Sequence, residues 1–411
     1  MSRERRPTEG AGGPGGAGRS EGTGVSRRSF LTDVFMCSLS AYGGPESHFG
    51  VFLNRLVHRR GYLSEGELVE LLALCSILPG PTSTQTIVSV GHRVGGRTLA
   101  LLTMFVWALP VLFAMSAASF AYEALAHSDM GTEALRFVPP IAVGFILYAA
   151  VRIGRKVVSD ALTAVLLVLS ATVTFFLRAP WVFPVVLVLG GAVALAADRE
   201  PRMWERGPLR PPWIFLGVFG ALALGGLLAA AVTDNLFLQL AESFYRYGYL
   251  VFGGGQVVVP VMQSELVGVR EYMSNAEFLT GYGLVQGLPG PMFSFAAYAG
   301  GMAGRGLGVA GQALAAAIGG VGIFLPGLLL IYFVYPLWED LKRIRAVRLS
   351  LRGVNAVAGG LIAVSAVMLA SSVGPAPGHL ALIATTAGLL FFTRVPPPLM
   401  VAAALAGGVV L

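Results

Sequence analysis

Long apolar runs separated by short polar segments make up most of the chain. The runs form two series. The first falls near residues 30–53, 66–95, 98–122, 137–151, 161–177, 181–197 and 213–232, and the second near 243–262, 277–304, 307–335, 353–371, 380–393 and 396–411. A helix needs about 20 predominantly apolar residues to cross the hydrocarbon core of a bilayer. The pattern therefore predicts an all-α polytopic membrane protein.

The composition agrees with this interpretation. Of the 411 residues, 55% are hydrophobic and only 12% are charged, against about 25% charged residues in an ordinary soluble domain. The mean hydropathy is +0.72. These values exclude a soluble enzyme. Glycine is also in excess, with 54 residues, which predicts close helix packing or helix breaks.

Polar segments divide the chain into regions. Residues 1–29 are rich in Gly, Arg and Ser, which predicts a disordered tail, and the excess of arginine places it in the cytoplasm. Residues 198–212 are charged and rich in proline, so we expect a cytoplasmic linker there. The expected transmembrane regions are therefore 30–197 and 213–411, the second with an extra span at 213–232.

The two transmembrane regions are related by an internal repeat. An offset of 210 residues aligns Phe30–Ala100 with the second region without a gap, and seventeen of the seventy-one positions are identical. A Gly-Gly pair and a Leu-Pro-Gly-Pro motif lie at the same spacing in both copies. A shared apolar composition alone does not account for this match, so we infer a duplicated module.

Charge distribution indicates that the repeats are inverted. Residues 123–136 carry three acids and one arginine, whereas the corresponding loop at 339–352 is mainly basic. Because basic loops stay in the cytoplasm, equivalent loops fall on opposite sides of the membrane. This assignment requires the first two runs of each repeat to be broken, re-entrant half-helices, which leaves about nine full spans among the thirteen runs.

Four helix breaks are the candidate site. They lie in the strings YGGPESH, LPGPTSTQ, FGGGQVVVP and QGLPGPMFS. Each break starts a new half-helix, whose unpaired N–H groups and partial positive charge attract an anion. The alternative is that the breaks serve only helix packing. The expected substrate-binding residues are Gly43, Gly44, Pro45, Pro79, Gly80, Pro81, Thr82, Ser83, Thr84, Gln85, Gly253, Gly254, Gly255, Gln256, Gln286, Pro289, Gly290, Pro291 and Ser294.

Few ionisable residues lie near the breaks, and intramembrane ionisable groups are functional candidates because burying them is costly. Arg246 precedes the third break and supplies a positive charge for an anion; alternatively it pairs with Glu242, one helical turn away. Glu46, His48 and Glu70 are candidates for proton coupling.

The sequence does not support nucleotide binding, a metal site or catalysis. There is no GxxxxGK[ST] loop and no CxxC pair, and we interpret Cys37 and Cys75 as packing residues. We therefore expect neither a metal nor another cofactor, and no enzymatic activity. The net charge of +7 is dispersed through short loops, which fits the positive-inside rule better than a nucleic-acid partner.

At these motifs the chain resembles the chromate ion transporter family in its long, two-domain form. The resemblance extends from about residue 30 to the end and includes the string IFLPGLLL at Ile323–Leu330. It implies an inner-membrane protein that exports chromate, with sulfate and related oxyanions as competitors. We expect a multi-pass protein that confers chromate resistance and has membrane lipid and a second copy of the chain as partners. The alternatives are a carrier of sulfate or another oxyanion, a membrane-embedded enzyme, and a scaffold without transport.

Overall fold

A computed structural model describes residues 26–126, 128–177, 179, 181–198, 211–251, 258–338 and 345–410. Most of the expected tail and linker lies outside the described residues. Four expected site residues lie outside them as well: Gly253, Gly254, Gly255 and Gln256.

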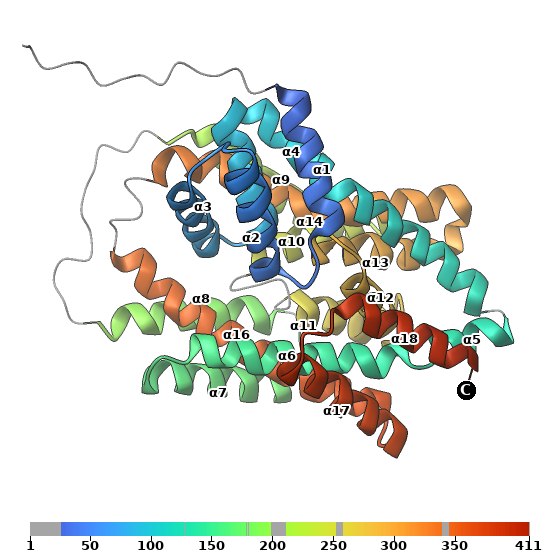
Figure 1. The fold of residues 1–411 in the computed structure, drawn as a ribbon. Helices are drawn as coiled ribbons and strands as arrows, with labels where there is room; N and C mark the ends of the chain where they lie inside the picture. The colour runs from blue at the N-terminus through green and yellow to red at the C-terminus, as the bar shows by residue number, and fades with distance from the viewer. Residues whose placement is uncertain are drawn as a thin grey trace, which may run out of the picture.

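The described chain is helical from end to end and contains no strand (Figure 1). The first repeat comprises α1 (Arg27–Ser40), α2 (Pro45–Phe52), η1 (Leu53–Arg59), α3 (Glu65–Ile77), α4 (Thr82–Ala126), α5 (Asp129–Leu135), α6 (Val138–Val157), α7 (Ala161–Phe176) and α8 (Val182–Ala196). The second comprises α9 (Trp213–Val232), α10 (Leu236–Leu250), α11 (Val258–Gln263), η3 (Ser264–Val269), α12 (Asn275–Gly287), η4 (Met292–Ser294), α13 (Phe295–Gly304), η5 (Arg305–Leu307), α14 (Gly308–Val334), η6 (Tyr335–Leu337), α16 (Arg345–Val373), α17 (Pro377–Phe392) and α18 (Pro397–Val410). The predicted all-α polytopic fold with two repeats is confirmed.

Equivalent elements of the two repeats share fine detail. Helices α3 and α12 each have 13 residues and begin with the same capping box, in which Ser64 and Glu67 correspond to Ser274 and Glu277. The π-helical segments η1 and η3 occupy the same place just before these helices. In both repeats the tyrosine that follows donates its N–H to a leucine carbonyl at 2.9 Å. The internal repeat is therefore structural as well as sequential.

Ion pairs show that the broken segments return to the side from which they start. Glu67, at the start of α3, pairs at 2.7 Å with Arg93, which lies beyond the break in the first part of α4. Glu277 and Arg305 pair in the same way at 2.5 Å across α12 and α13. Each broken pair is thus a hairpin with both ends together.

The first hairpin of the amino-terminal repeat closes in the same manner. Asp33 of α1 is fully buried and pairs with Arg55 at 2.9 Å and Arg60 at 2.8 Å, both from the far end of the hairpin. Tyr62 donates its hydroxyl to the second carboxylate oxygen at 2.7 Å. All of the carboxylate's strong partners therefore come from the other arm.

The long helices that follow the hairpins establish the inversion. Helix α4 is divided at Gly95 and Gly96, and its second part runs opposite to α14 in Figure 1. Arg352, near the start of α16, pairs with Asp160, just after the end of α6. Equivalent helices α6 and α16 therefore lie antiparallel, as inverted repeats require.

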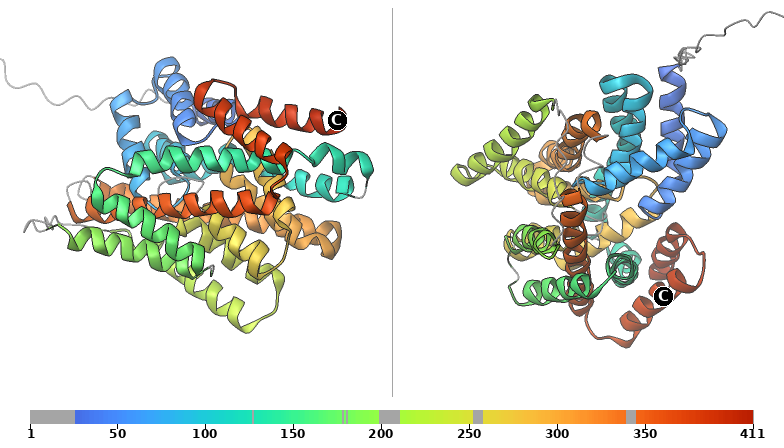
Figure 2. Two further views of the ribbon diagram at one scale, coloured as in Figure 1. Left: turned by 90° about the horizontal axis from the view of Figure 1, so that it is seen from below. Right: turned by 90° about the vertical axis from the view of Figure 1, so that its left-hand side faces the viewer.

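Within the ranges that the structure describes, five stretches of helix are long and apolar enough to cross a membrane: Thr82–Leu125, Met130–Val157, Trp213–Val232, Met292–Leu337 and Arg348–Val373. Helices α7, α8, α17 and α18 are apolar but have only 14 to 16 residues. Helix α9 lies at the rim of the molecule (Figure 2) and has no buried residue.

The core lies between the repeats, where small residues let the backbones approach. Helix α16 packs against α6, α7 and α8, and Gly353 meets the backbone of Gly190 directly. Ser170 donates to the carbonyl of Val357 at 3.1 Å across this interface. Close approach through small residues is the usual way in which membrane helices gain packing energy.

Candidate functional site

The helix breaks of the two repeats are joined by a reciprocal pair of hydrogen bonds. The N–H of Gly80, in the first Leu-Pro-Gly-Pro motif, donates to the carbonyl of Val251 at 2.8 Å. The N–H of Gly290, in the second motif, donates to the carbonyl of Ala41 at 2.7 Å. Ala41 and Val251 are equivalent positions, each directly after the first half-helix of its repeat. We call this pair of contacts the crossing.

The crossing depends on two glycine conformations. Gly80 has φ +124° and Gly290 has φ +109°, values that side chains with a Cβ atom rarely adopt. A Cβ atom on Gly80 would lie 2.8 Å from Nε2 of Gln85, and one on Gly290 would lie 2.9 Å from Val111. The glycines therefore serve both backbone shape and close approach.

Gln85 fills the space beside the first motif. Its Nε2 donates to the carbonyl of Pro79 at 2.9 Å, and its side chain also contacts Gly327 of α14. A cavity of about 10 Å³ lies here, lined by Pro81, Thr84 and Gln85 together with residues of α14. This is about the volume that one water molecule requires, so the site must open before it can admit a tetrahedral oxyanion.

Thr84 and His48 meet at one large aromatic residue of the first repeat. The buried indole N–H of Trp107 donates to the hydroxyl of Thr84 at 3.1 Å. The ring of His48 is 2% exposed and lies edge-on to the same indole, with 5.3 Å between ring centroids. Trp107 therefore holds together residues from α2 and the start of α4.

Two half-helices that start at the breaks lack a side-chain cap, as do α1, α6, α8, α9 and α17 elsewhere in the chain. Helix α2 begins after Gly44 and η4 after Pro291, and neither start has a side-chain cap. Helices α3 and α12, in contrast, carry capping boxes, and Asn235 caps α10. At the two break-side starts the first N–H groups thus lack a side-chain acceptor and keep their attraction for an anion.

Hydroxyl groups surround the second motif. Ser294 is fully buried and Ser38 of α1 is 2% exposed, and neither Oγ has a hydrogen-bond partner among the residues that the structure describes. The carbonyl of Ser38 lies 3.7 Å from the position of a Cβ atom on Gly290. Gln286, half-buried, points its amide nitrogen at the sulfur of Met292 at 3.1 Å. The second break therefore offers free hydroxyl groups where the first offers Gln85.

Arg246 lies in a buried ionic cluster on the same helix that leads to the crossing. It pairs with Glu242 at 2.6 Å and with Glu265 of η3 at 2.9 Å. The alternative that the sequence left open, a pair with Glu242, is present in the structure. In this conformation two carboxylates compete with any anion for the guanidinium.

The remaining expected residues lie in different surroundings. Thr82 is half-buried and Ser83 is buried in the first turn of α4, while Pro79 and Pro289 are half-buried within their motifs. Glu70 lies on the exposed face of α3, away from the crossing. Pro45 and Glu46 fall in the first turn of α2, and their side chains lie outside the described part.

Sequence reasoning missed several residues of this region. Three residues outside the four motifs contact the breaks: Trp107, Gly327 and Ser38. Glu265 was also missed, although the repeat could have found it, because it occupies the position equivalent to Arg55. An alignment of the two halves shows this signal: an acid in one copy stands where the other copy has a base.

The fold and the site together define a class: a multi-pass membrane protein of two inverted repeats whose broken helices meet at the centre, the architecture of many secondary transporters. The family model for chromate transporters matches residues 29–196 and 238–409. The chain belongs to this family. Helix α9 lies between the two matched segments.

Relatives with a chromate transport name align over most of the chain. The chromate transport protein of Cupriavidus metallidurans is 27% identical over 90% of this chain and 89% of its own length. The probable chromate transport protein of Synechococcus elongatus is 28% identical over 92% and 94%, and the chromate transport protein of Pseudomonas aeruginosa is 26% identical over 81% and 78%. No solved structure is significantly similar to the chain.

Proposed function

We propose that this protein exports chromate across the inner membrane and so confers chromate resistance. The observation that carries the proposal is the crossing, where backbone hydrogen bonds join the breaks of the two repeats, with the uncapped starts of α2 and η4 a few residues further along the chain. Such starts bind an anion through backbone N–H groups. The names of three relatives that align over most of this chain supply the substrate.

Binding at the crossing is expected to involve oxygen atoms of the substrate only. The groups available are N–H donors of the half-helix starts and the hydroxyl groups of Thr82, Ser83 and Ser294. These groups recognise a tetrahedral array of oxygens and not the central atom. Sulfate and related oxyanions are therefore expected competitors for the same site.

The membrane potential supports the direction of transport. We place the amino terminus in the cytoplasm, in accordance with its arginine content. A dianion that leaves a cell with a negative interior gains ~4.6 kcal/mol at 100 mV. This free energy opposes a concentration gradient of about a thousandfold.

The test is uptake of labelled chromate into everted membrane vesicles under an imposed potential, positive inside. We expect accumulation that collapses when the potential is dissipated and that sulfate inhibits by competition. Replacement of both Pro81 and Pro291 by alanine should abolish uptake while the protein still inserts, because continuous helices would cover the N–H groups. Absence of accumulation in vesicles that contain inserted wild-type protein would reject the proposal.

A further inference from the structure

The charged residues around Arg246 form a largely buried cluster. Glu242 is 8% exposed and Glu265 is 4% exposed. Arg246 bonds both oxygens of Glu242, at 2.6 and 3.0 Å, and one oxygen of Glu265, at 2.9 Å. Ser243 donates to that same oxygen of Glu265 at 3.0 Å. Two buried acids thus share one partly buried base.

A phenol lies beside one carboxylate oxygen of this cluster. Oε2 of Glu265 and the hydroxyl of Tyr247 are both buried, and they are near enough for the hydroxyl to interact with the carboxylate. Two carboxylates around the one guanidinium of Arg246 leave one negative charge without a close counter-charge, and burial of such a charge is costly. Protonation of Glu265 would remove this cost.

The equivalent place in the first repeat has the opposite arrangement. There Asp33 on the first arm meets Arg55 on the second, and both carboxylate oxygens are bonded. In the second repeat Ser243 takes the position of Asp33 and Glu265 takes that of Arg55. In the first repeat the hairpin is thus closed by one acid paired with two bases, whereas in the second repeat two acids share Arg246.

The groups that face Glu265 come from two elements. Helix α10 contributes one acid, one base and two phenols, and the segment after η3 contributes one base and one phenol. They are Glu242, Arg246, Tyr247, Tyr249, Arg270 and Tyr272. Helix α9 presents Gly226 to Glu242 and adds no charge. Arg270 is 4.0 Å from Glu265 and is partly exposed, so Arg246 is the main counter-charge.

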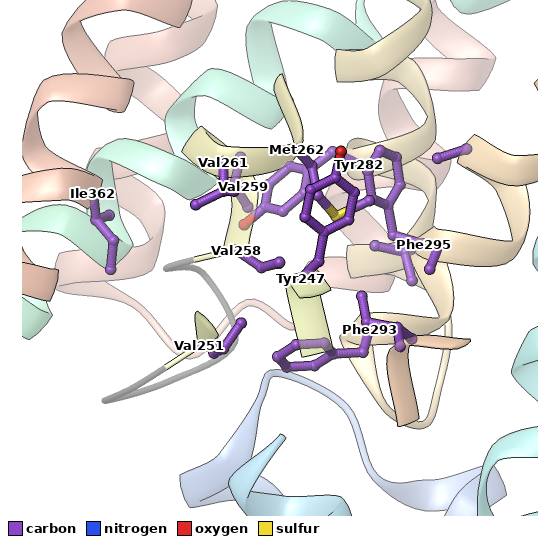
Figure 3. Close-up of a cluster of buried hydrophobic side chains, with 14 of the residues drawn as sticks. Tyr247, Val251, Val258, Val259, Val261, Met262, Tyr282, Phe293, Phe295 and Ile362 are labelled. Atoms are coloured by element: carbon purple, nitrogen blue, oxygen red, sulfur yellow. The ribbon is translucent and has the colours of Figure 1, made fainter. Parts of the chain in front are cut away.

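The cluster lies close to the crossing along α10. Arg246 is five residues before Val251, whose carbonyl accepts the hydrogen bond from Gly80, and this separation is about 7.5 Å along a helix. Figure 3 shows Tyr247 between this end of α10 and the side chains Met262 and Tyr282 of α11 and α12. A movement that opens the crossing therefore moves the arm that carries Arg246.

We propose that Glu265 is a proton-binding residue that couples proton movement to oxyanion movement. This inference rests on the proposed function. A proton from the aqueous side binds Oε2 of Glu265, which frees one face of Arg246 for an oxyanion at the crossing. Oxyanion and proton then cross together, and Glu265 returns the proton to water on the far side as Arg246 pairs with it again.

This coupling has a measurable consequence for charge. A dianion that moves with one proton carries one net negative charge, whereas a dianion alone carries two. The equilibrium accumulation of chromate should change about tenfold for each unit of pH gradient imposed at constant potential. Export remains driven by the potential, but through one net charge and not two, so that the gradient opposed at 100 mV falls from about a thousandfold to about fiftyfold. A cytoplasm more acidic than the exterior would favour coupled export further.

The experiment uses purified protein in liposomes that contain a pH-sensitive dye, at a pH where chromate is the dianion, with the potential clamped by a potassium gradient and ionophore. We expect a chromate gradient to carry protons in the same direction. Glu265→Gln should move chromate without protons, with two net charges for each chromate. Glu67→Gln, which removes a carboxylate from an exposed ion pair, is the matched control and should keep the wild-type ratio.

The outcomes separate the two proposals. Chromate flux in the wild type without proton flux rejects the coupling and leaves the proposed function intact, as does proton flux that persists in Glu265→Gln. Absence of chromate flux in the wild type rejects both. If Glu265→Gln does not fold, the wild-type ratio decides, together with Glu265→Asp, which should retain proton flux because it keeps a carboxylate.

Discussion

The two motif glycines at the crossing bear the tightest constraint among the positive-φ glycines of the described residues. Gly80 and Gly290 combine a left-handed backbone with a neighbour inside the space of a Cβ atom. Gly66, in α3, has ordinary helical geometry, and no atom lies within 4 Å of the place that a Cβ atom would take there. The same substitution should therefore have opposite effects at these sites.

We predict that Gly80→Ala and Gly290→Ala each lower the free energy of unfolding by about 2 kcal/mol, from left-handed strain and the close contact together. Chromate transport should fall at least tenfold, because the crossing would be displaced. Gly66→Ala should be neutral or slightly stabilising. Thermal unfolding in detergent and vesicle uptake measure the two effects; equal stability of all three variants would contradict the prediction.

Sequence could locate the breaks but not their partners. Proline and glycine interrupt a helix by local sterics, so Gly80 and Pro81 are recognisable without a structure. Contact of Gly80 with Val251 depends on tertiary packing, which no local pattern encodes. Glu265 was not identified from the sequence because it lies in the π-helical segment η3. In such a segment the usual 3.6-residue periodicity does not indicate which face is buried.

At the scale of elements, the hairpin is the unit that the two repeats share. Each second hairpin is closed at its ends by a glutamate from the capping box and an arginine from the returning arm. The backbone N–H of Ser64 and the guanidinium of Arg93 hold the pKa of Glu67 below its usual range. Because the folded pKa is lowered, this stabilisation is present near neutral pH and is lost as the pH falls through that pKa.

We predict that the two second hairpins open to opposite sides of the membrane. Gly66→Cys and Thr98→Cys should react with an impermeant maleimide from one side only, and Ala276→Cys and Val309→Cys only from the other, because all four positions lie near hairpin ends and none is buried. Background is expected to be low, since both native cysteines are buried. Labelling of Gly66→Cys and Thr98→Cys from different sides would mean that the segment crosses the membrane.

The hairpins were predictable because two independent signals agreed. Breaks near the middle of apolar runs and basic residues at both ends require a return to the same side, and the ion pairs show that return. Span lengths were less predictable. Helices α7, α8, α17 and α18 are shorter than the ~20 residues of a full span, since polar residues and prolines at their ends stop the helices early.

For the whole molecule, stability resides in the buried contacts between helices and not at the periphery. Phe244 of α10 is fully buried and lies against Gly319 and Gly322 of α14. Leu224 of α9 is 59% exposed and faces the surroundings that lipid would occupy. Both are large apolar residues of neighbouring helices, which makes them a matched pair.

We predict that Phe244→Ala lowers the free energy of unfolding by about 3–5 kcal/mol, since it opens a cavity at the packed face. Leu224→Ala should change it by less than about 0.5 kcal/mol. Thermal unfolding of both variants in the same detergent provides the comparison. A similar loss of unfolding free energy in the two variants would mean that α9 contributes as much to stability as the packed face around Phe244. That result would contradict the prediction.

The crossing also constrains the order in which the two repeats can fold during translation. Gly80 emerges long before Val251, and Ala41 long before Gly290, so neither hydrogen bond can form while the first repeat is the only part made. A nascent first repeat would hold its break with an unmet N–H at membrane depth, at a cost of several kcal/mol. Both repeats can therefore complete their folding only after the second repeat has been made. Chains arrested before residue 290 are expected substrates for membrane proteases.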